Sequence, residues 1–162
     1  MEKSIEIKLI SIFLMNNTYI SSNNIVKKEY CDRNNHLNIA FYMMYYSDAT
    51  FDFLNEIGLT EEYKSINILT AVVSKSFTIY KKELYYNDIF RIESNMIFCN
   101  HSHIVILHKI QKGNTLVNKC YMRLDFINTF NRSKIDIPSE IATNLDKFLL
   151  KGVKNIFTGL II

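Results

Sequence analysis

The stretch DRNNHLNIAFYMMYY, residues 32–46, joins a polar turn directly to an apolar run. Apolar residues continue at helical spacing through residues 38–57, which predicts a helix of about 20 residues and about 30 Å. Gly58 follows at the position where a left-handed residue commonly ends a helix. The first two turns, residues 39–46, are apolar on every side. Because such a helix must be covered on all sides, we expect the remainder of the chain to wrap around it.

Four downstream segments have the composition of β-strands. In two of them apolar and polar side chains alternate with a period of two, and two further apolar runs complete the set. We therefore expect strands at residues 68–80, 90–98, 103–110 and 116–126. Short polar turns separate them at residues 86–88, 100–102 and 112–114. Turns of this length predict antiparallel neighbours, so the chain should form a strand, a long buried helix and an antiparallel meander curled around it, which is the α+β hotdog arrangement.

The length of 162 residues suits one domain that buries about two-thirds of its extended-chain surface. We assign the hotdog domain to residues 25–138. Residues 1–24 form an N-terminal extension of uncertain structure, because their apolar positions fit both a strand and a helix. Residues 139–162 are predicted to form a helix and tail packed on the same domain, with Ser139 as the cap after Pro138. The apolar face of that helix would comprise Ile141, Leu145, Phe148 and Leu149.

Composition restricts the class of protein. The formal net charge is +3, with 22% charged residues and scattered lysines, which is weak evidence for nucleic acid and equally compatible with an anionic small ligand. The chain has three cysteines, Cys31, Cys99 and Cys120, and they form no C-x-x-C motif. Any disulfide would leave at least one cysteine unpaired, so we expect reduced thiols in a cytoplasmic protein. The apolar run at residues 9–15 lacks the flanks of a signal peptide, and no segment approaches about 20 apolar residues, so we expect no membrane span.

Asp32 and His36 stand just before the predicted helix. A helix N-terminus carries unpaired backbone N–H groups and a partial positive charge, so it can hold the oxygen of a polarised carbonyl, and the N–H of Ile39 lies in that first turn. Asp32 is a candidate catalytic carboxylate, although an aspartate before Asn-Asn also commonly forms an Asx turn. His36 is a candidate catalytic or positioning residue, with a purely structural role as the alternative. Asn38 is a candidate N-cap.

These residues resemble the signature of the 4-hydroxybenzoyl-CoA thioesterase-like branch of the hotdog superfamily, roughly D-x-x-G-H-(V/M)-N-x-A-x-Y. Here the signature reads Asp32, Asn35, His36, Leu37, Asn38, Ala40 and Tyr42. The similarity covers about residues 25–138 and continues through Asp48-Ala49, Gly58, Asn87-Asp88, Leu124-Asp125, Arg132 and Ile137-Pro138. Asn35 replaces the family glycine, and because asparagine is the best substitute in left-handed backbone, we expect the turn to persist.

The resemblance implies an acyl-CoA thioesterase that hydrolyses the thioester of a small or fatty acyl-CoA, with an acyl-carrier thioester as the other candidate substrate. In relatives that this chain resembles, the motif aspartate attacks the thioester carbonyl or activates water. The implied catalytic set comprises Asp32, His36, Asn38 and the backbone N–H of Ile39. The implied substrate contacts are Asn35, Phe41, Tyr42, Tyr45, Arg91 and Arg132, with Lys81, Lys82 and Lys134 as further candidate phosphate partners. No cofactor is expected, because coenzyme A is part of the substrate.

Other functions fit parts of the same sequence. A hotdog enoyl-CoA hydratase or dehydratase has a motif similar to D-x-N-x-x-H, but one residue is missing here between Asn34 and His36. A non-catalytic acyl-CoA-binding hotdog protein is a third interpretation. Asp48 and Asp52 lie one helical turn apart and could supply a helix carboxylate instead, although a solvated helix face is the simpler explanation.

Metal and cysteine chemistry are not expected. His101 and His103 lie on the same side of the predicted strand or turn and His108 on the opposite face, so fewer than three ligands converge. Cys31, beside Asp32, has no histidine on the right face for a Cys-His pair.

The predicted fold leaves surfaces that a single chain does not cover. One curved sheet around one helix has an open edge and an open helix flank, and pairing with a second copy could cover both. We therefore expect a homodimer or homotetramer.

Overall fold

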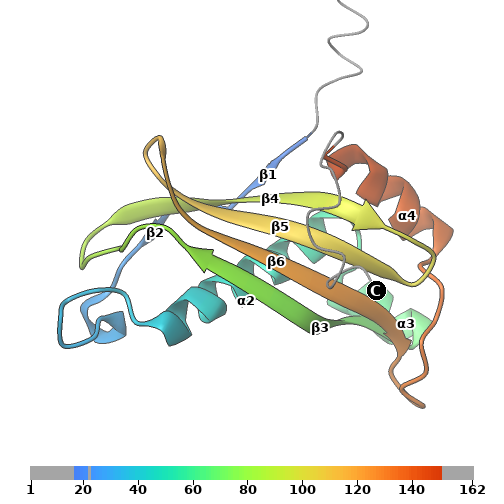
Figure 1. The fold of residues 1–162 in the computed structure, drawn as a ribbon. Coiled ribbons are helices and arrows are strands. Elements are labelled where there is room, and N and C mark those ends of the chain that lie inside the picture. The colour runs from blue at the N-terminus through green and yellow to red at the C-terminus, as the bar shows by residue number, and fades with distance from the viewer. Residues whose placement is uncertain (1–16, 22, 151–162) are drawn as a thin grey trace, which may run out of the picture.

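A computed structural model describes residues 17–21 and 23–150 (Figure 1). Its elements, in chain order, are β1 (Tyr19–Ile20), β2 (Asn24–Ile25), η1 (Lys28–Tyr30), α2 (Ile39–Glu56), α3 (Glu61–Asn67), β3 (Leu69–Tyr80), β4 (Ile89–Cys99), β5 (His103–Lys112), β6 (Thr115–Asn128), α4 (Ser139–Leu145) and η2 (Asp146–Phe148). The apolar run at residues 9–15 and residues 151–162 of the predicted tail lie outside the described residues. None of the described helices is long and apolar enough to cross a membrane.

The helix predicted at residues 38–57 is confirmed as α2. Asn38 precedes it in an extended conformation, with φ −64° and ψ 143°. At the other end Gly58 has φ +90°, a left-handed conformation that glycine adopts at no steric cost. The polar turn and the glycine therefore set the two ends of the helix that the apolar run forms.

The strands form one antiparallel sheet of six, in the order β1-β4-β5-β6-β3, with β2 also paired to β4. The four predicted strands are confirmed as β3 to β6, with small differences at their ends. β4, β5 and β6 are consecutive neighbours, as their short connections predict. Figure 1 shows α2 lying across one face of this sheet.

The prediction that β3 and β4 are neighbours is wrong. β3 pairs with β6 along its whole length, so it lies at the edge of the sheet away from β4. The reason is that the connection is longer than the turn at residues 86–88. Residues 81–88 cross the end of the sheet, and the N–H groups of Lys81 and Lys82 both donate to the carbonyl of Val117 at 3.0 Å.

The core lies between α2 and the sheet. Tyr46 and Phe53 of α2 are fully buried there. The expectation that the first turns of the helix are covered on all sides is wrong for the single chain, because Ile39 is 64% exposed and Met43 is 36% exposed. The sheet covers only one side of α2, and the open helix flank predicted from the fold is present.

The apolar face predicted for one C-terminal helix is divided between two short helices. Ile141 and Leu145 of α4 and Phe148 of η2 are buried against the core, and Leu149, which follows η2, is partly buried. The predicted cap is wrong, because Pro138 holds the N-cap position and Ser139 makes no capping hydrogen bond. Proline fixes φ near −65° and has no N–H to satisfy, so it starts the helix one residue earlier than a serine cap would.

Candidate active site

The turn between η1 and α2 is built around Asp32. Its Oδ1 accepts hydrogen bonds from the backbone N–H groups of Asn34, at 2.9 Å, and His36, at 3.1 Å. Asn35 has φ 66°, the left-handed conformation expected of a residue in the place of the family glycine. The Asx turn that the sequence left open is therefore present. Asp32 is exposed, and its Oδ2 accepts no hydrogen bond within the described chain.

The N-terminus of α2 follows this turn directly. The predicted N-cap is confirmed, because Asn38 Oδ1 accepts the N–H of Ala40 at 3.0 Å. The carbonyl of Asn38 accepts the N–H of Phe41, also at 3.0 Å. The N–H of Ile39 donates to no other residue in the described ranges. A free N–H in the first turn of a helix is suited to bind a polarised carbonyl oxygen.

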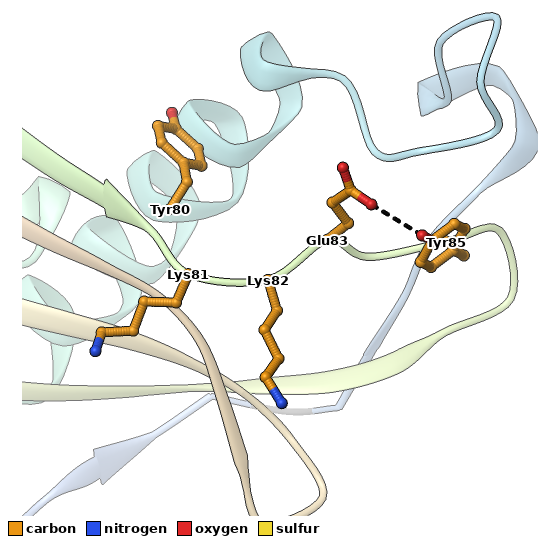
Figure 2. Close-up of a pocket in the computed structure, with 5 residues that line it drawn as sticks. All are labelled: Tyr80, Lys81, Lys82, Glu83 and Tyr85. Carbon is orange, nitrogen blue, oxygen red and sulfur yellow. Dashed lines mark hydrogen bonds between the residues drawn. The ribbon is translucent and has the colours of Figure 1, made fainter.

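His36 faces a segment that the sequence did not connect with it. Its Nδ1 lies 3.4 Å from Glu83 Oε1, and Glu83 Oε2 accepts a hydrogen bond from the Tyr85 hydroxyl at 2.8 Å (Figure 2). The rings of His36 and Tyr85 make an edge-to-face contact at 4.9 Å between centroids. The N–H of Leu37 donates to the carbonyl of Leu84 at 2.7 Å. These contacts hold the imidazole at the turn, so Glu83 and Tyr85 join the candidate site.

An open hollow of about 570 Å³ borders the same segment. Its lining comprises Tyr80, Lys81, Lys82, Glu83 and Tyr85. Figure 2 shows the Glu83 carboxylate on one side of the segment and the two lysine side chains on the other. The hollow therefore presents two ammonium groups, together with the carboxylate that faces His36.

A second hollow, of about 580 Å³, lies on the flank of α2. Its lining is mostly apolar and comprises Met43, Met44, Ser47, Thr50, Phe51 and Leu54 of α2, Lys64 of α3, and Ala71, Val73, Met122 and Leu124 of the sheet. Met43 lies one helical turn after Ile39. The hollow therefore begins about one turn from the free N–H and can accommodate an apolar group.

The aromatic residues predicted to contact substrate pack beside the start of α2. Phe41 stacks on Tyr30 with 4.2 Å between ring centroids. The hydroxyl of Tyr45 donates to a backbone carbonyl of β2 at 3.1 Å. Tyr42 contacts Tyr80 edge to face at 5.4 Å, and burial raises the pKa of Tyr42 to about 12. Neither hollow is lined by these three predicted residues, so their contact with substrate stays a prediction.

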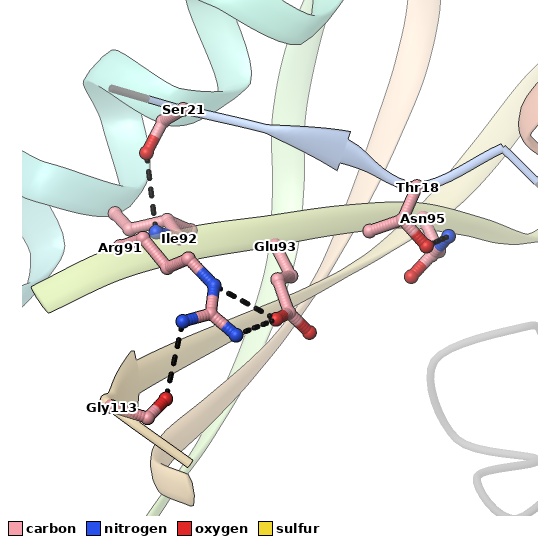
Figure 3. Close-up of polar contacts among 7 residues, drawn as sticks. All are labelled: Thr18, Ser21, Arg91, Ile92, Glu93, Asn95 and Gly113. Atoms are coloured by element: carbon pink, nitrogen blue, oxygen red, sulfur yellow. Dashed lines mark hydrogen bonds and ion pairs between the residues drawn. The ribbon is translucent and has the colours of Figure 1, made fainter. Parts of the chain in front are cut away.

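The two arginines predicted to contact phosphate have different surroundings. Arg91 donates through Nε and Nη2 to Glu93 Oε1, at 3.2 and 2.9 Å, and through Nη1 to the carbonyl of Gly113 at 3.1 Å (Figure 3). Arg132 is exposed in the connection after β6, with φ 62°. Neither arginine lines either hollow.

The remaining polar candidates lie apart from this site. Asp48 and Asp52 are exposed on α2. Cys31 Sγ donates to the carbonyl of Lys27 at 3.4 Å. In the described part of the chain, no three His, Cys, Asp or Glu side chains come together in a group that could hold a metal ion.

Residues 26–145 match the family model of the thioesterase-like superfamily. The chain belongs to this superfamily. The matched residues include the whole turn from Asp32 to Asn38 and all four long strands, so the resemblance predicted from the motif is confirmed. A comparison with curated proteins finds no match.

Solved structures share the fold of this superfamily member. A hypothetical protein from Staphylococcus aureus, solved in complex with CoA, is 19% identical with a TM-score of 0.78, over 90% of this chain and 92% of its own. A gentisyl-coenzyme A thioesterase is 17% identical with a TM-score of 0.68, over 78% of this chain and 99% of its own. YbaW, a probable thioesterase from Escherichia coli, is 14% identical with a TM-score of 0.69, over 82% of this chain and 100% of its own. The predicted hotdog fold is confirmed.

Proposed function

We propose that this superfamily member hydrolyses the thioester bond of a small or fatty acyl-CoA. The observation that carries the proposal is the free N–H of Ile39 at the start of α2, directly after the turn that holds the Asp32 carboxylate. The family and the CoA-bound relative support a CoA thioester as the substrate. A thiol-release assay across acyl-CoA chain lengths tests it. Hydration of enoyl-CoA without any thiol release would instead indicate a hydratase.

In the proposed reaction the thioester carbonyl oxygen accepts a hydrogen bond from the N–H of Ile39. One such donor is worth about 10²–10³ in rate when it is aimed at the developing oxyanion. The Asp32 carboxylate either attacks the carbonyl carbon or takes a proton from the attacking water. The products are a carboxylic acid and the thiol of coenzyme A. Water is the only co-reactant, so this reaction requires no cofactor.

Glu83→Gln is expected to lower kcat at least about 10-fold with little change in KM. The substitution removes the negative charge that faces His36 Nδ1 but keeps an oxygen that can accept the Tyr85 hydroxyl. Steady-state thiol release measures both constants. Tyr85→Phe is the matched control, because it removes the hydroxyl and keeps the ring contact with His36, and we expect it to change kcat less. Equal kcat values for Glu83→Gln and the wild type would exclude Glu83 from the site.

The acyl chain of the proposed substrate would lie in the hollow on the α2 flank. Between Met43 and Leu54, which both line it, the helix rises about 16 Å. Ala71→Phe would fill this hollow from β3. We expect the variant to hydrolyse long-chain acyl-CoA at least about 10-fold more slowly, with acetyl-CoA unaffected, because even one methylene that no longer fits a hydrophobic site costs about 10-fold or more.

Val72→Phe is the matched control for this substitution. Successive side chains of a strand point to opposite faces, and Val72 does not line the hollow, so its chain-length profile should follow the wild type. Identical profiles for Ala71→Phe and the wild type would exclude the hollow as the acyl site.

We further propose that a second copy of the chain covers the flank of α2 and the edge of the sheet. β3 is the last strand in the sheet order and carries Val73, which is 51% exposed. Ile39 and Phe51 are exposed on the neighbouring helix. Sedimentation equilibrium should report a dimer or tetramer, and Val73→Lys should shift it toward monomer. A wild-type monomer at all concentrations would contradict the proposal.

A further inference from the structure

The basic side chains that are candidates to bind phosphate differ in their polar contacts and in their positions. The guanidinium of Arg91 is occupied by a carboxylate and a backbone carbonyl (Figure 3). Lys134 Nζ lies 3.2 Å from Asp125 Oδ2. Lys134 and Arg132 both follow β6, whose two ends are roughly 40 Å apart, and the segment beside His36 meets the other end of that strand. Arg91 is therefore already engaged, and Lys134 and Arg132 lie far from the His36 turn.

Lys81 and Lys82 are placed differently. Both are exposed and line the hollow beside the site, and neither ammonium group forms an ion pair with another described residue. Their backbone N–H groups share the carbonyl of Val117 at 3.0 Å, which fixes the point from which the side chains extend. Figure 2 shows both side chains directed away from the Glu83 carboxylate.

The hollow borders the candidate active site. Glu83 lines it, and its Oε1 lies 3.4 Å from His36 Nδ1, so a ligand that extends from the two lysines past Glu83 would reach the His36 turn. Two adjacent ammonium groups without carboxylate partners favour an anion such as phosphate. The Glu83 carboxylate repels an anion nearer His36. The charges therefore set the direction in which a ligand with one anionic end would lie.

We propose that Lys81 and Lys82 bind the phosphate end of a phosphopantetheine thioester, whose thioester end is directed toward His36 and Asp32. The assignment rests on the proposed thioesterase function and identifies the basic residues that serve it. The phosphate belongs either to coenzyme A or to the phosphopantetheine arm of a carrier protein. In both cases the two ammonium groups would contact a phosphate group.

Binding of coenzyme A to the full-length protein, measured by isothermal titration calorimetry without turnover, tests the assignment. For the Lys81→Ala/Lys82→Ala variant we expect the Kd to rise at least about 10-fold at low ionic strength, and less at high salt because the contacts are exposed. Pantetheine, which lacks phosphate, should bind both proteins equally. The unfolding temperature of the variant shows whether the fold is retained, and each single variant should show part of the loss.

Lys109→Ala/Lys119→Ala is the matched control. These two lysines face each other across β5 and β6 and lie outside the hollow, so the variant loses the same net charge and should bind coenzyme A as the wild type does. An equal loss of affinity in both double variants would attribute the effect to net charge and overturn the proposal. Unchanged coenzyme A and carrier-protein affinity in Lys81→Ala/Lys82→Ala would overturn it as well.

A carrier protein bearing phosphopantetheine separates the two sources of phosphate. Lysine-dependent binding of the carrier protein alone, of coenzyme A alone, or of both supports the assignment and names the source. The outcome is also separable from the proposed reaction. Lysine-dependent binding without thiol release would support the phosphate site and contradict the thioesterase function. Thiol release with lysine-independent binding would support the thioesterase function and contradict the phosphate site.

Discussion

Asp32→Asn is expected to lower kcat/KM for acyl-CoA hydrolysis at least about 100-fold while the fold is retained. Asparagine keeps the side-chain oxygen that accepts the N–H groups of Asn34 and His36, so the Asx turn should persist. The substitution removes the negative charge needed for attack or for proton abstraction. Thiol release measures the rate of the purified variant, and circular dichroism and Tm measure its fold.

Asp48→Asn and Asp52→Asn are the matched controls for this experiment. Both carboxylates are exposed on α2, and each substitution changes the net charge by the same amount. We expect near wild-type rates from both. A wild-type rate for Asp32→Asn would remove Asp32 from the mechanism, and a loss confined to Asp48→Asn or Asp52→Asn would move the catalytic carboxylate to the helix.

The features that the sequence predicted correctly depend on neighbours along the chain. The apolar run, Asn38 and Gly58 determine both ends of α2, because capping and helical spacing act within a few residues. The left-handed Asn35 follows from the same kind of local rule. The turn that carries Asp32 could therefore be predicted almost completely, including the Asx turn that competes with a catalytic role.

The features that were missed depend on pairing between distant segments. β3 pairs with β6 because residues 81–88 cross the end of the sheet. The alternation of apolar and polar residues in a strand does not indicate which other strand it pairs with. The same crossing brings Glu83 to His36, so the charged partner of the motif histidine could not be read from spacing around the motif. The expectation that the first turns of α2 are covered on all sides was wrong for a related reason, since apolar composition alone does not say which face the sheet covers.

The buried imidazole of His108, in β5, contacts polar side chains of α2 and β4. Its Nε2 lies 2.9 Å from Thr50 Oγ1 and its Nδ1 lies 2.8 Å from Ser94 Oγ. Because the Thr50 hydroxyl donates to the carbonyl of Tyr46 at 2.7 Å, Nε2 carries the proton and Nδ1 accepts from Ser94. Burial lowers the pKa of His108 from 6.5 to about 3, and raises that of Cys120, its cross-strand neighbour, to about 11. All of these groups are therefore neutral near pH 7.

The free energy of unfolding is expected to fall as pH is lowered from about 6.5 toward 3, with His108 contributing up to about 1.4 kcal/mol per pH unit. In the unfolded chain the imidazole binds a proton below pH 6.5, whereas in the folded protein it remains neutral until about pH 3. The unfolded state therefore binds more protons in this window, and stability is lost as pH falls. Urea unfolding at successive pH values measures the slope.

His108→Gln should flatten this pH dependence, because glutamine offers a donor and an acceptor to Thr50 and Ser94 but does not ionise. Two other groups act in the same direction. Burial and nearby Arg123 lower the pKa of His103, and Asp125 has a lowered pKa because hydrogen bonds from basic side chains outweigh its burial. Both groups are unchanged in His108→Gln, so the difference between its slope and that of the wild type, measured from pH 6.5 to 4.5, isolates His108. Equal slopes would show that this imidazole takes up a proton inside the folded protein.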